Sequence, residues 1–507
     1  MRLRGRLSRL TGPADVPVES RTEPENAPPL SPLPDDGVFE ACAIGPGVAD
    51  RFVEVDEDAL RPAWGTSKPR ARLALDTAGM PATLADLRER MARVLEKAPA
   101  ERAPSPPPVD LPELPFVAEE TPLGVLHVRA RRLSAAHRVG HVGVLPAKSA
   151  RPEVLALLAL DTSLAGCSPE RALYLDTETT GLSGGTGTVA FLVGLAFFEP
   201  SKEPGGSGGA WVVEQLLVRE LGEEAPMLAR VAERLAAAEM IVTFNGKSFD
   251  MPLLRTRFML AGLPLPPEPP HLDLVHVARR IHKARNVPCK LTKLEEHILG
   301  FVRVDDVPSG EVAGHYLHFL RTGDTRGLVG VVDHNGWDVE TMIAFVALYG
   351  EPLDETRLGA KELVGVARTL RRSDRMTEAL LFAERAVAEG AGPEGLRARA
   401  ELKKARGDRE AALLDFESLA AQVDCPKTRF ELVKLYEHVR KSPERALEVL
   451  AQGTHERPDL ADKRRARLEK KVAKGLAHKT DDGPLFGPRA QPGEPTMLAE
   501  GSLPKRR

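Results

Sequence analysis

The sequence predicts a mixed α/β domain followed by an all-α region, and three observations lead to this fold class. Three apolar segments joined by short turns, at residues 172–182, 188–198 and 211–218, predict an antiparallel meander. Helical and strand patterns then alternate over residues 223–260, which predicts parallel strands added to the meander. After about Gly359 strand patterns disappear, and the remaining pattern is helical.

A meander extended by parallel strands and flanked by helices is the ribonuclease H-like plan, and we expect it over residues 121–350. At 507 residues, the chain is long enough for two folded domains with tails. Proline-rich stretches predict a mostly disordered arm over residues 1–110, with an isolated helix at residues 82–99, and a disordered tail over residues 476–507.

The all-α region is expected over residues 360–475 because an Ala-Leu pair recurs in similar surroundings. The alanines are Ala379, Ala412 and Ala446, at spacings of 33 and 34 residues. A period of about 34 is typical of tetratricopeptide helix pairs, in which small residues let paired helices pack closely. A plain helical bundle with accidental periodicity is the alternative.

Composition and charge exclude several classes. A net charge of -3 argues against binding nucleic acid through the charge of the whole protein. The longest apolar run, residues 189–198, is too short to cross a bilayer, and the basic N-terminus lacks the apolar stretch of a secretory signal. We therefore expect a cytoplasmic protein with no membrane association.

Acidic residues at the ends of predicted elements are the candidates for chemistry. DTETTG places Asp176 and Glu178 on one face at the end of a strand, where paired carboxylates favour a hard cation such as Mg²⁺ or Mn²⁺. Asp250 begins a helix directly after another strand. On a further predicted helix, His334 precedes Asp338 by four residues, so both face the same way. Each motif taken alone would more often be a surface feature.

In this order, DxE, NxxxFD and HxxxD match the DEDD superfamily of 3′-5′ exonucleases. More closely, LYLDTETTGLSGGTGTVAFLVGLAFFE, VTFNGKSFDMPLLRTRF, PPHLDLVHVARRIHKAR, CKLTKLEEHILGF and DDVPSGEVAGHY resemble the bacterial YprB-like ribonuclease H-like family. The resemblance covers Thr121 to about Gly350. Members of that family often carry C-terminal tetratricopeptide-like repeats.

The resemblance implies a site with two divalent ions, Mg²⁺ or Mn²⁺. Asp176, Glu178 and Asp338 would ligate the first ion, and Asp176 would help to hold the second. Asp250 would act at the second ion through water. His334 would be the general base that accepts the proton of the attacking water. In DEDD enzymes the base is Tyr four residues before the last Asp or His five before it, so the four-residue spacing here departs from the pattern.

Further residues have a structural alternative beside the functional one. Asp333 and His315 are candidate bases if His334 is not the base. Asp273 would support the site from behind or cap a helix. By resemblance or by charge, the residues expected to contact nucleic acid are Thr179, Thr180, Gly181, Leu182, Asn245, Lys247, Phe249 and Arg255. The loop SGGTGT lacks the GK[ST] ending of a phosphate-binding loop, so no nucleotide cofactor is expected.

The sequence thus predicts a metal-dependent 3′-5′ exonuclease acting on single-stranded DNA or RNA. The helical repeats would recruit a protein partner or guide the substrate. Two alternatives stay open. One is a noncatalytic scaffold that binds nucleic acid and acts through its repeats, and the other is a structure-selective endonuclease of the same fold.

Overall fold

The computed structural model describes residues 111–181, 187–201 and 208–473. The predicted disordered arm, the predicted helix at residues 82–99 and the predicted tail over residues 476–507 lie outside these ranges. Within them, no helix is both long and apolar enough to cross a membrane.

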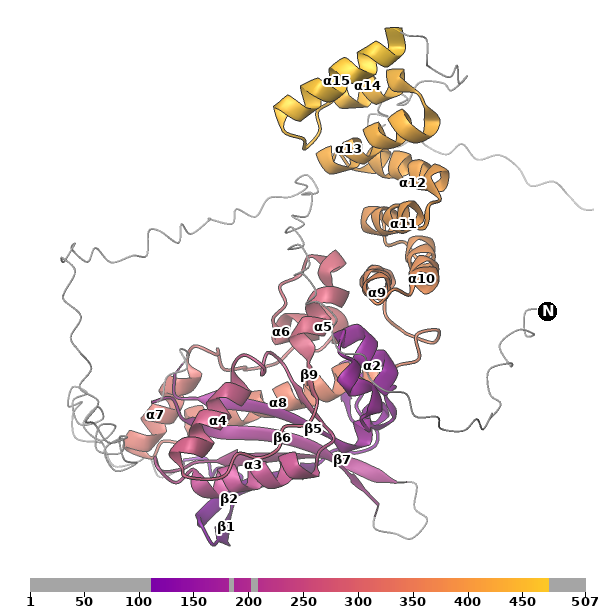
Figure 1. Ribbon diagram of the computed structural model, residues 1–507. Helices are drawn as coiled ribbons and strands as arrows, with labels where there is room; N and C mark the ends of the chain where they lie inside the picture. Colours follow the sequence, from indigo (N-terminus) through magenta and orange to yellow (C-terminus); the bar gives the residue numbers. More distant parts are fainter. Residues whose placement is uncertain (1–110, 182–186, 202–207, 474–507) are drawn as a thin grey trace, which may run out of the picture. The chain divides into compact units, whose positions relative to one another are not determined.

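A seven-stranded mixed sheet forms the centre of the α/β domain (Figure 1). Its strand order is β1-β2-β7-β6-β5-β8-β9. The strands are Val117–Thr121 (β1), Gly124–Arg132 (β2), Ala172–Thr179 (β5), Ala190–Pro200 (β6), Gly209–Leu217 (β7), Met240–Thr243 (β8) and His271–Asp273 (β9). Strands β5, β6 and β7 form the antiparallel meander, whereas β8 runs parallel to β5 and β9 parallel to β8. The predicted ribonuclease H-like plan is confirmed. The short strands Arg138–Val139 (β3) and Val142–Gly143 (β4) form a separate ribbon.

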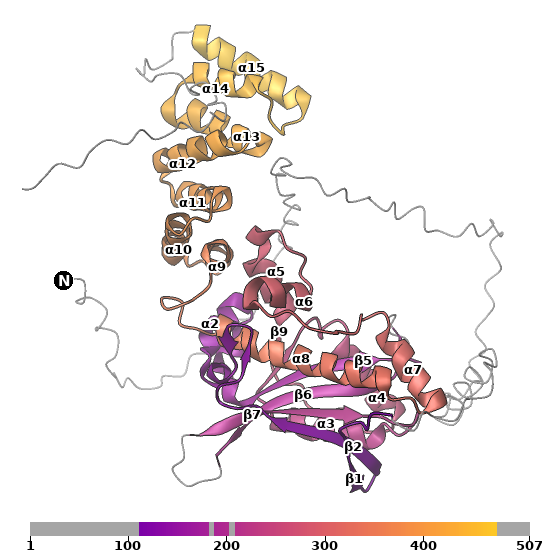
Figure 2. The same cartoon turned by 180° about the vertical axis from the view of Figure 1, so that it is seen from behind.

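Helices cover both faces of this sheet. Helices α3 and α4 pack on one face in one apolar cluster, and α2, α5 and α8 pack on the other face in a second cluster. Figure 2 shows α8 lying over this face of the sheet. The helices of this domain are Pro152–Ala159 (α2), Ala225–Ala237 (α3), Asp250–Leu260 (α4), Leu274–Ile281 (α5), Leu291–Leu294 (α6), Val312–Thr322 (α7) and Arg326–Tyr349 (α8).

The alternation of side chains along β5 decides which face receives the acidic residues. Leu173 and Leu175 belong to the cluster under α3 and α4, whereas Tyr174 belongs to the cluster under α8. Because successive side chains point to opposite faces, Asp176 and Glu178 continue on the α8 face. Strand β8 pairs with β5 only along Ala172, Leu173 and Tyr174. The carboxyl end of β5 therefore lies between an antiparallel and a parallel neighbour, where ligand crevices form in open sheets.

The region after the α/β domain is helical, as predicted. Its helices are Ala360–Arg372 (α9), Met376–Ala388 (α10), Pro393–Arg406 (α11), Arg409–Gln422 (α12), Pro426–Leu435 (α13), Pro443–Ala451 (α14) and Pro458–Ala473 (α15), with a π-helical turn at Tyr436–Arg440. The recurring Ala379, Ala412 and Ala446 lie on α10, α12 and α14, and all three are fully buried. Small residues therefore stand where these helices pack. That the repeats are of the tetratricopeptide kind stays a prediction.

Helix α9 shares a hydrophobic core with the α/β domain. Leu363 and Val366 of α9 belong to the same apolar cluster as Ile281 of α5 and Phe345 of α8. A Cβ at Gly365 would overlap the backbone of α5, so glycine allows the close approach of the two helices. The first helix of the helical region is thus part of the domain's packing.

Candidate active site

Asp176 and Glu178 lie at the carboxyl end of β5, on the face covered by α8. Asp176 is paired in register with Gly194 of β6, and the register shifts between Glu178 and Thr179. Such irregularities commonly occur next to active sites, where they redirect side chains. Asp176 accepts a hydrogen bond of 2.9 Å from Nδ2 of Asn335 on α8. Strand and helix therefore meet at this carboxylate.

Asp250 is the first residue of α4 and is buried. Its Oδ1 accepts a hydrogen bond of 2.6 Å from Oγ1 of Thr177, the β5 residue between the two site carboxylates. The loop that leads to Asp250 is anchored by Asp273, whose two oxygens accept from the backbone N–H groups of Asn245 (2.7 Å) and Lys247 (3.1 Å). Asp273 holds in place the loop that positions Asp250.

Asp273 also accepts a hydrogen bond from the N–H of Val275 and caps α5. The helix-capping alternative proposed for it is therefore correct, and the same carboxylate supports the site through the backbone of the preceding loop.

Helix α8 brings His334, Asn335 and Asp338 against β5. Ligand atoms of Glu178, His334 and Asp338 all lie within 4.8 Å of one another, and they are the one group among the described residues that could hold a metal ion in this way. Nε2 of His334 lies 4.0 Å from Oε1 of Glu178 and 3.6 Å from Oδ2 of Asp338. The predicted first-ion set joined Asp176 to Glu178 and Asp338, whereas this compact group has His334 in its place.

Burial and mutual repulsion raise the pKa values of carboxylates in the site. Burial, followed by repulsion from Asp338, Glu178 and Asp250, raises the pKa of Asp176 well above its usual value. Burial and then Asp338 raise the pKa of Glu178 to about 7. Burial raises the pKa of Asp250 to about 6, against the hydrogen bond from Thr177. Four carboxylates that repel one another in a largely buried place favour a multivalent cation.

An arginine that the sequence did not predict as a site residue lies beside these carboxylates. The Arg303 side chain is 3% exposed and donates to Glu295 with Nε (2.8 Å) and Nη2 (2.6 Å), and Nη2 also contacts Oδ1 of Asp338. Glu295 in turn accepts a hydrogen bond of 2.6 Å from Thr341 of α8. Because Arg303 meets Asp338 through Oδ1, Oδ2 of Asp338 faces His334 and the metal-ligand group. No sequence motif singled out this arginine.

The donor set fits a divalent ion. Carboxylate oxygens suit Mg²⁺ and Mn²⁺, and imidazole suits transition metals better than Mg²⁺. The oxygens come from Asp176 and Glu178 on β5 and from Asp338 on α8. Asp250 adds a fourth carboxylate from α4.

The residues expected to contact nucleic acid lie in different settings. Thr179 and Thr180 directly follow the acidic pair, and their hydroxyls bond to the backbone of Gly181 and Val189. Phe249, next to Asp250, is 60% exposed. Leu182 lies outside the described residues.

Several basic residues of this part of the chain are engaged within the protein. Arg255 forms a two-point ion pair with Glu268, and Arg257 is buried against Glu224. Lys247 is more open, with Nζ 3.8 Å from Asp161.

The two alternative bases do not join the group of metal-ligand atoms. Asp333 faces Arg129, with 3.4 Å between Oδ1 and Nη1. His315 lies on α7, where Nε2 is 3.9 Å from Glu311. His334 is thus the candidate base that the fold brings to the carboxylates.

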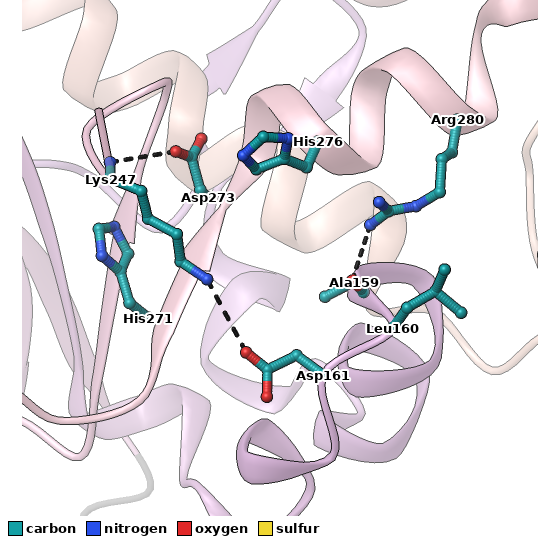
Figure 3. A pocket seen from close by; sticks show the side chains of 8 residues that line it. All are labelled: Ala159, Leu160, Asp161, Lys247, His271, Asp273, His276 and Arg280. Atoms are coloured by element: carbon teal, nitrogen blue, oxygen red, sulfur yellow. Dashed lines mark hydrogen bonds and ion pairs between the residues drawn. The ribbon is translucent and has the colours of Figure 1, made fainter. Parts of the chain in front are cut away.

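A cavity of about 370 Å³ lies beside the loop that precedes Asp250 (Figure 3). It is lined by Ala159, Leu160, Asp161, Lys247, His271, Asp273, His276 and Arg280. Arg280 donates to the carbonyl oxygens of Leu158 and Ala159, and so caps the end of α2. Burial lowers the pKa of His271 to about 4, so its imidazole is neutral near pH 7. None of the five candidate catalytic residues lines this cavity.

Comparisons with known proteins agree with this geometry. A family model described as the RNase_H superfamily matches residues 173–349, a segment that contains all five candidate catalytic residues. The chain is also similar to a protein of Bacillus subtilis (strain 168) named "Uncharacterized protein YprB", with 29% identity over 324 residues. That alignment covers 62% of this chain and 76% of the Bacillus protein. The aligned length exceeds the matched segment, so the similarity extends beyond it.

Proposed function

We propose, from the premise that residues 173–349 form a YprB-like ribonuclease H-like domain, that the protein is a metal-dependent 3′-5′ exonuclease of single-stranded nucleic acid. The observation that carries the proposal is the meeting of four carboxylates from β5, α4 and α8 in one cluster, of which Asp250 is buried and the other three are partly buried. Burying mutually repelling carboxylates is costly, and a structural role does not require it.

In the proposed reaction, Asp176, Glu178, Asp250 and Asp338 would hold two divalent ions, Mg²⁺ or Mn²⁺. Bound there, the ions would supply an activated water and charge neutralisation for in-line cleavage of a phosphodiester bond. Nε2 of His334 points toward Glu178 and Asp338 and would accept the proton of the attacking water. Thr179, Thr180, Gly181 and Leu182, with Asn245, Lys247, Phe249 and Arg255, would contact the strand.

A cleavage assay tests the proposal. The protein is incubated with 5′-labelled single-stranded DNA and RNA, with Mg²⁺, Mn²⁺ or EDTA, beside an Asp176→Asn variant. We expect ladders of shortening products that require metal, and a loss of at least about 10³-fold in the variant, because a site carboxylate loses its charge while its shape is kept. Asp305→Asn is the matched control, since Asp305 is exposed.

The outcomes separate the three candidate functions. Internal products on a substrate with both ends blocked would favour the structure-selective endonuclease. If the wild type and the variant bind all substrates equally and cleave none of them, the noncatalytic scaffold is favoured. A protein partner bound through the predicted helical repeats would be compatible with each of these functions.

A further inference from the structure

Asp306 lies in the segment between α6 and α7 and contacts the imidazole of the candidate base. Its Oδ1 is 2.6 Å from Nδ1 of His334, and its side chain is 24% exposed. The two residues are 28 positions apart in the chain. The motif DDVPSG, which contains Asp306, has no part in the proposed reaction described above.

Two groups compete for Nδ1 of His334, and they require opposite tautomers. A carboxylate only accepts, so Asp306 requires a proton on Nδ1. The guanidinium of Arg303 only donates, so its Nη1, at 3.3 Å, would require a bare Nδ1. Asp306 is closer by 0.7 Å, and Arg303 has other acceptors in Glu295 and Asp338. The contact with Asp306 therefore decides the tautomer.

With the proton on Nδ1, the lone pair of the neutral imidazole is on Nε2. That atom is the one that faces Glu178 and Asp338, at 4.0 Å and 3.6 Å. A carboxylate that holds one nitrogen of a histidine fixes both the ring orientation and the tautomer, and leaves the other nitrogen as the base.

We propose that Asp306 is a positioning residue that holds His334 with its proton on Nδ1 and its basic Nε2 directed at the carboxylate cluster. The inference rests on the proposed function, in which His334 accepts the proton of the attacking water. The four-residue spacing between His334 and Asp338 does not by itself fix the orientation of the imidazole ring. The contact with Asp306 fixes that orientation and directs the ring toward the cluster.

The segment that carries Asp306 is fixed to the site by its own arginine. Arg303 is anchored by Glu295 and Asp338, and Glu295 is fully buried. Three residues after Arg303, Asp306 comes beside both Nδ1 of His334 and Nη1 of Arg303, at 2.6 Å and 3.6 Å. Between them, Asp305 has a φ of +56°, a conformation that Asn and Asp tolerate. The position of Asp306 is thus set by backbone and side-chain contacts together.

A double-mutant cycle tests the inference in the full-length protein. The four proteins are wild type, Asp306→Asn, His334→Gln and the double variant, with kcat and KM measured on the preferred single-stranded substrate. Asp306→Asn should lower kcat about 10- to 100-fold with KM little changed, because an amide can donate to Nδ1 and stabilise the wrong tautomer. In the His334→Gln background, the same change should alter kcat by less than about threefold, because Asp306 acts through His334.

Metal affinity and a neighbouring variant are the controls. Binding of Mn²⁺ to Asp306→Asn should match wild type within about threefold, because neither Asp306 nor His334 is a metal ligand in the proposed reaction. Asp305→Asn should keep full activity, because its side chain is exposed and asparagine suits the positive φ. An equal loss of kcat in both backgrounds, or weakened Mn²⁺ binding as the main effect, would overturn the inference.

The tautomer is also measurable without activity, which separates this inference from the proposed function. Magic-angle-spinning ¹⁵N NMR of histidine-labelled protein distinguishes the two nitrogens, and a pH series shows where the imidazole is neutral. The His334 signal is identified by its loss in His334→Gln. A protonated Nδ1 in wild type that changes in Asp306→Asn supports the inference even if no substrate is cut. A protonated Nε2 in wild type refutes it even if the protein is an active nuclease.

Discussion

Asn335 shows how one uncharged side chain orients a charged site. It is fully buried, donates from Nδ2 to Asp176 and accepts from Nε2 of Gln215 at 3.0 Å with Oδ1. The carboxamide can lie there because Gly194 of β6, the register partner of Asp176, has no side chain. A Cβ at Gly194 would overlap the Asn335 carboxamide. The glycine is therefore part of the site.

Replacing this glycine should damage both stability and the site. We expect Gly194→Ala to cost about 1–3 kcal/mol in the free energy of unfolding, because the buried Asn335 must move. Urea denaturation measures this cost, and the cleavage assay should show reduced activity. Gly166→Ala is the matched control, since a Cβ there meets nothing within 4 Å. Equal stability of the two variants would contradict the close approach.

The raised pKa values of the carboxylates predict how stability depends on pH. Glu178 and Asp250 titrate at about 7 and about 6 when folded, against ordinary values of 4.5 and 3.8. Protons therefore bind more tightly to the folded state. The stability that Glu178 and Asp250 gain by binding protons is fully present below pH 3.8 and is lost as the pH rises through 6 and 7.

We therefore expect the Tm of the metal-free protein to fall between pH 5 and pH 8. Saturating Mn²⁺ should raise Tm more at pH 8 than at pH 5. At pH 8 the carboxyl groups are already ionised, whereas at pH 5 the ion must displace protons from them. Differential scanning fluorimetry with EDTA or Mn²⁺ measures both effects. Asp250→Asn should flatten the pH dependence and reduce the Mn²⁺ shift. A metal shift that is the same at both pH values would show that the cluster does not bind the ion.

At the scale of elements, the sequence patterns predicted β5, α4 and α8 because each has a strong local signal. A continuous apolar run that ends in DTETTG predicts where a strand stops, and the spacing of His334 and Asp338 predicts a helix face. Arg303 and Asp306 could not be found in this way. Their contacts with α8 join residues 28 to 35 positions apart, through a segment without regular periodicity.

The same limit applies to the group of ligand atoms. The family resemblance implied Asp176, Glu178 and Asp338 as one set, whereas the compact group contains Glu178, His334 and Asp338. The hydrogen bond from Asn335 to Asp176 crosses between two elements that are 159 residues apart in the chain. One signal was present in the sequence: Asn335 and Gly336 are poor helix formers in the middle of a predicted helix, which often marks a constrained position.

The loop between β8 and α4 offers a test at this scale. Asp273 accepts from three backbone N–H groups, so Asp273→Ala should cost about 2–4 kcal/mol through the lost cap and unpaired donors. It should also weaken Mn²⁺ binding, because Asp250 follows the released loop. Asp161→Ala is the comparison, since Asp161 caps the N–H of Ser163 near the protein surface. If both variants lost equal stability and neither bound Mn²⁺ less tightly, the loop would not position Asp250.

At the scale of the whole molecule, a buried polar cluster ties the helical region to the α/β domain. Glu362 of α9 accepts from Nη2 of Arg285 at 3.0 Å and lies 3.2 Å from Nδ1 of His282. Nε2 of the same histidine is 2.7 Å from the hydroxyl of Tyr349, the last residue of α8. The side chains of Glu362 and His282 are 2% and 3% exposed. The ends of α5 and α8 are thus joined to the first helix of the helical region.

Removing Glu362 should therefore destabilise both regions together. Glu362→Ala leaves Arg285 and a buried histidine without their acceptor, which should cost about 3–5 kcal/mol. Unfolding is followed by tryptophan fluorescence in a Trp64→Phe background, where Trp211 and Trp337 report the α/β domain, and by far-ultraviolet circular dichroism, which reports mainly the helices. Both midpoints should fall together because α9 belongs to the shared core. Lys361→Ala, at an exposed neighbouring position, should shift neither midpoint. A lower midpoint in circular dichroism alone would mean that the helical region unfolds independently of the α/β domain, and that the candidate site persists without it.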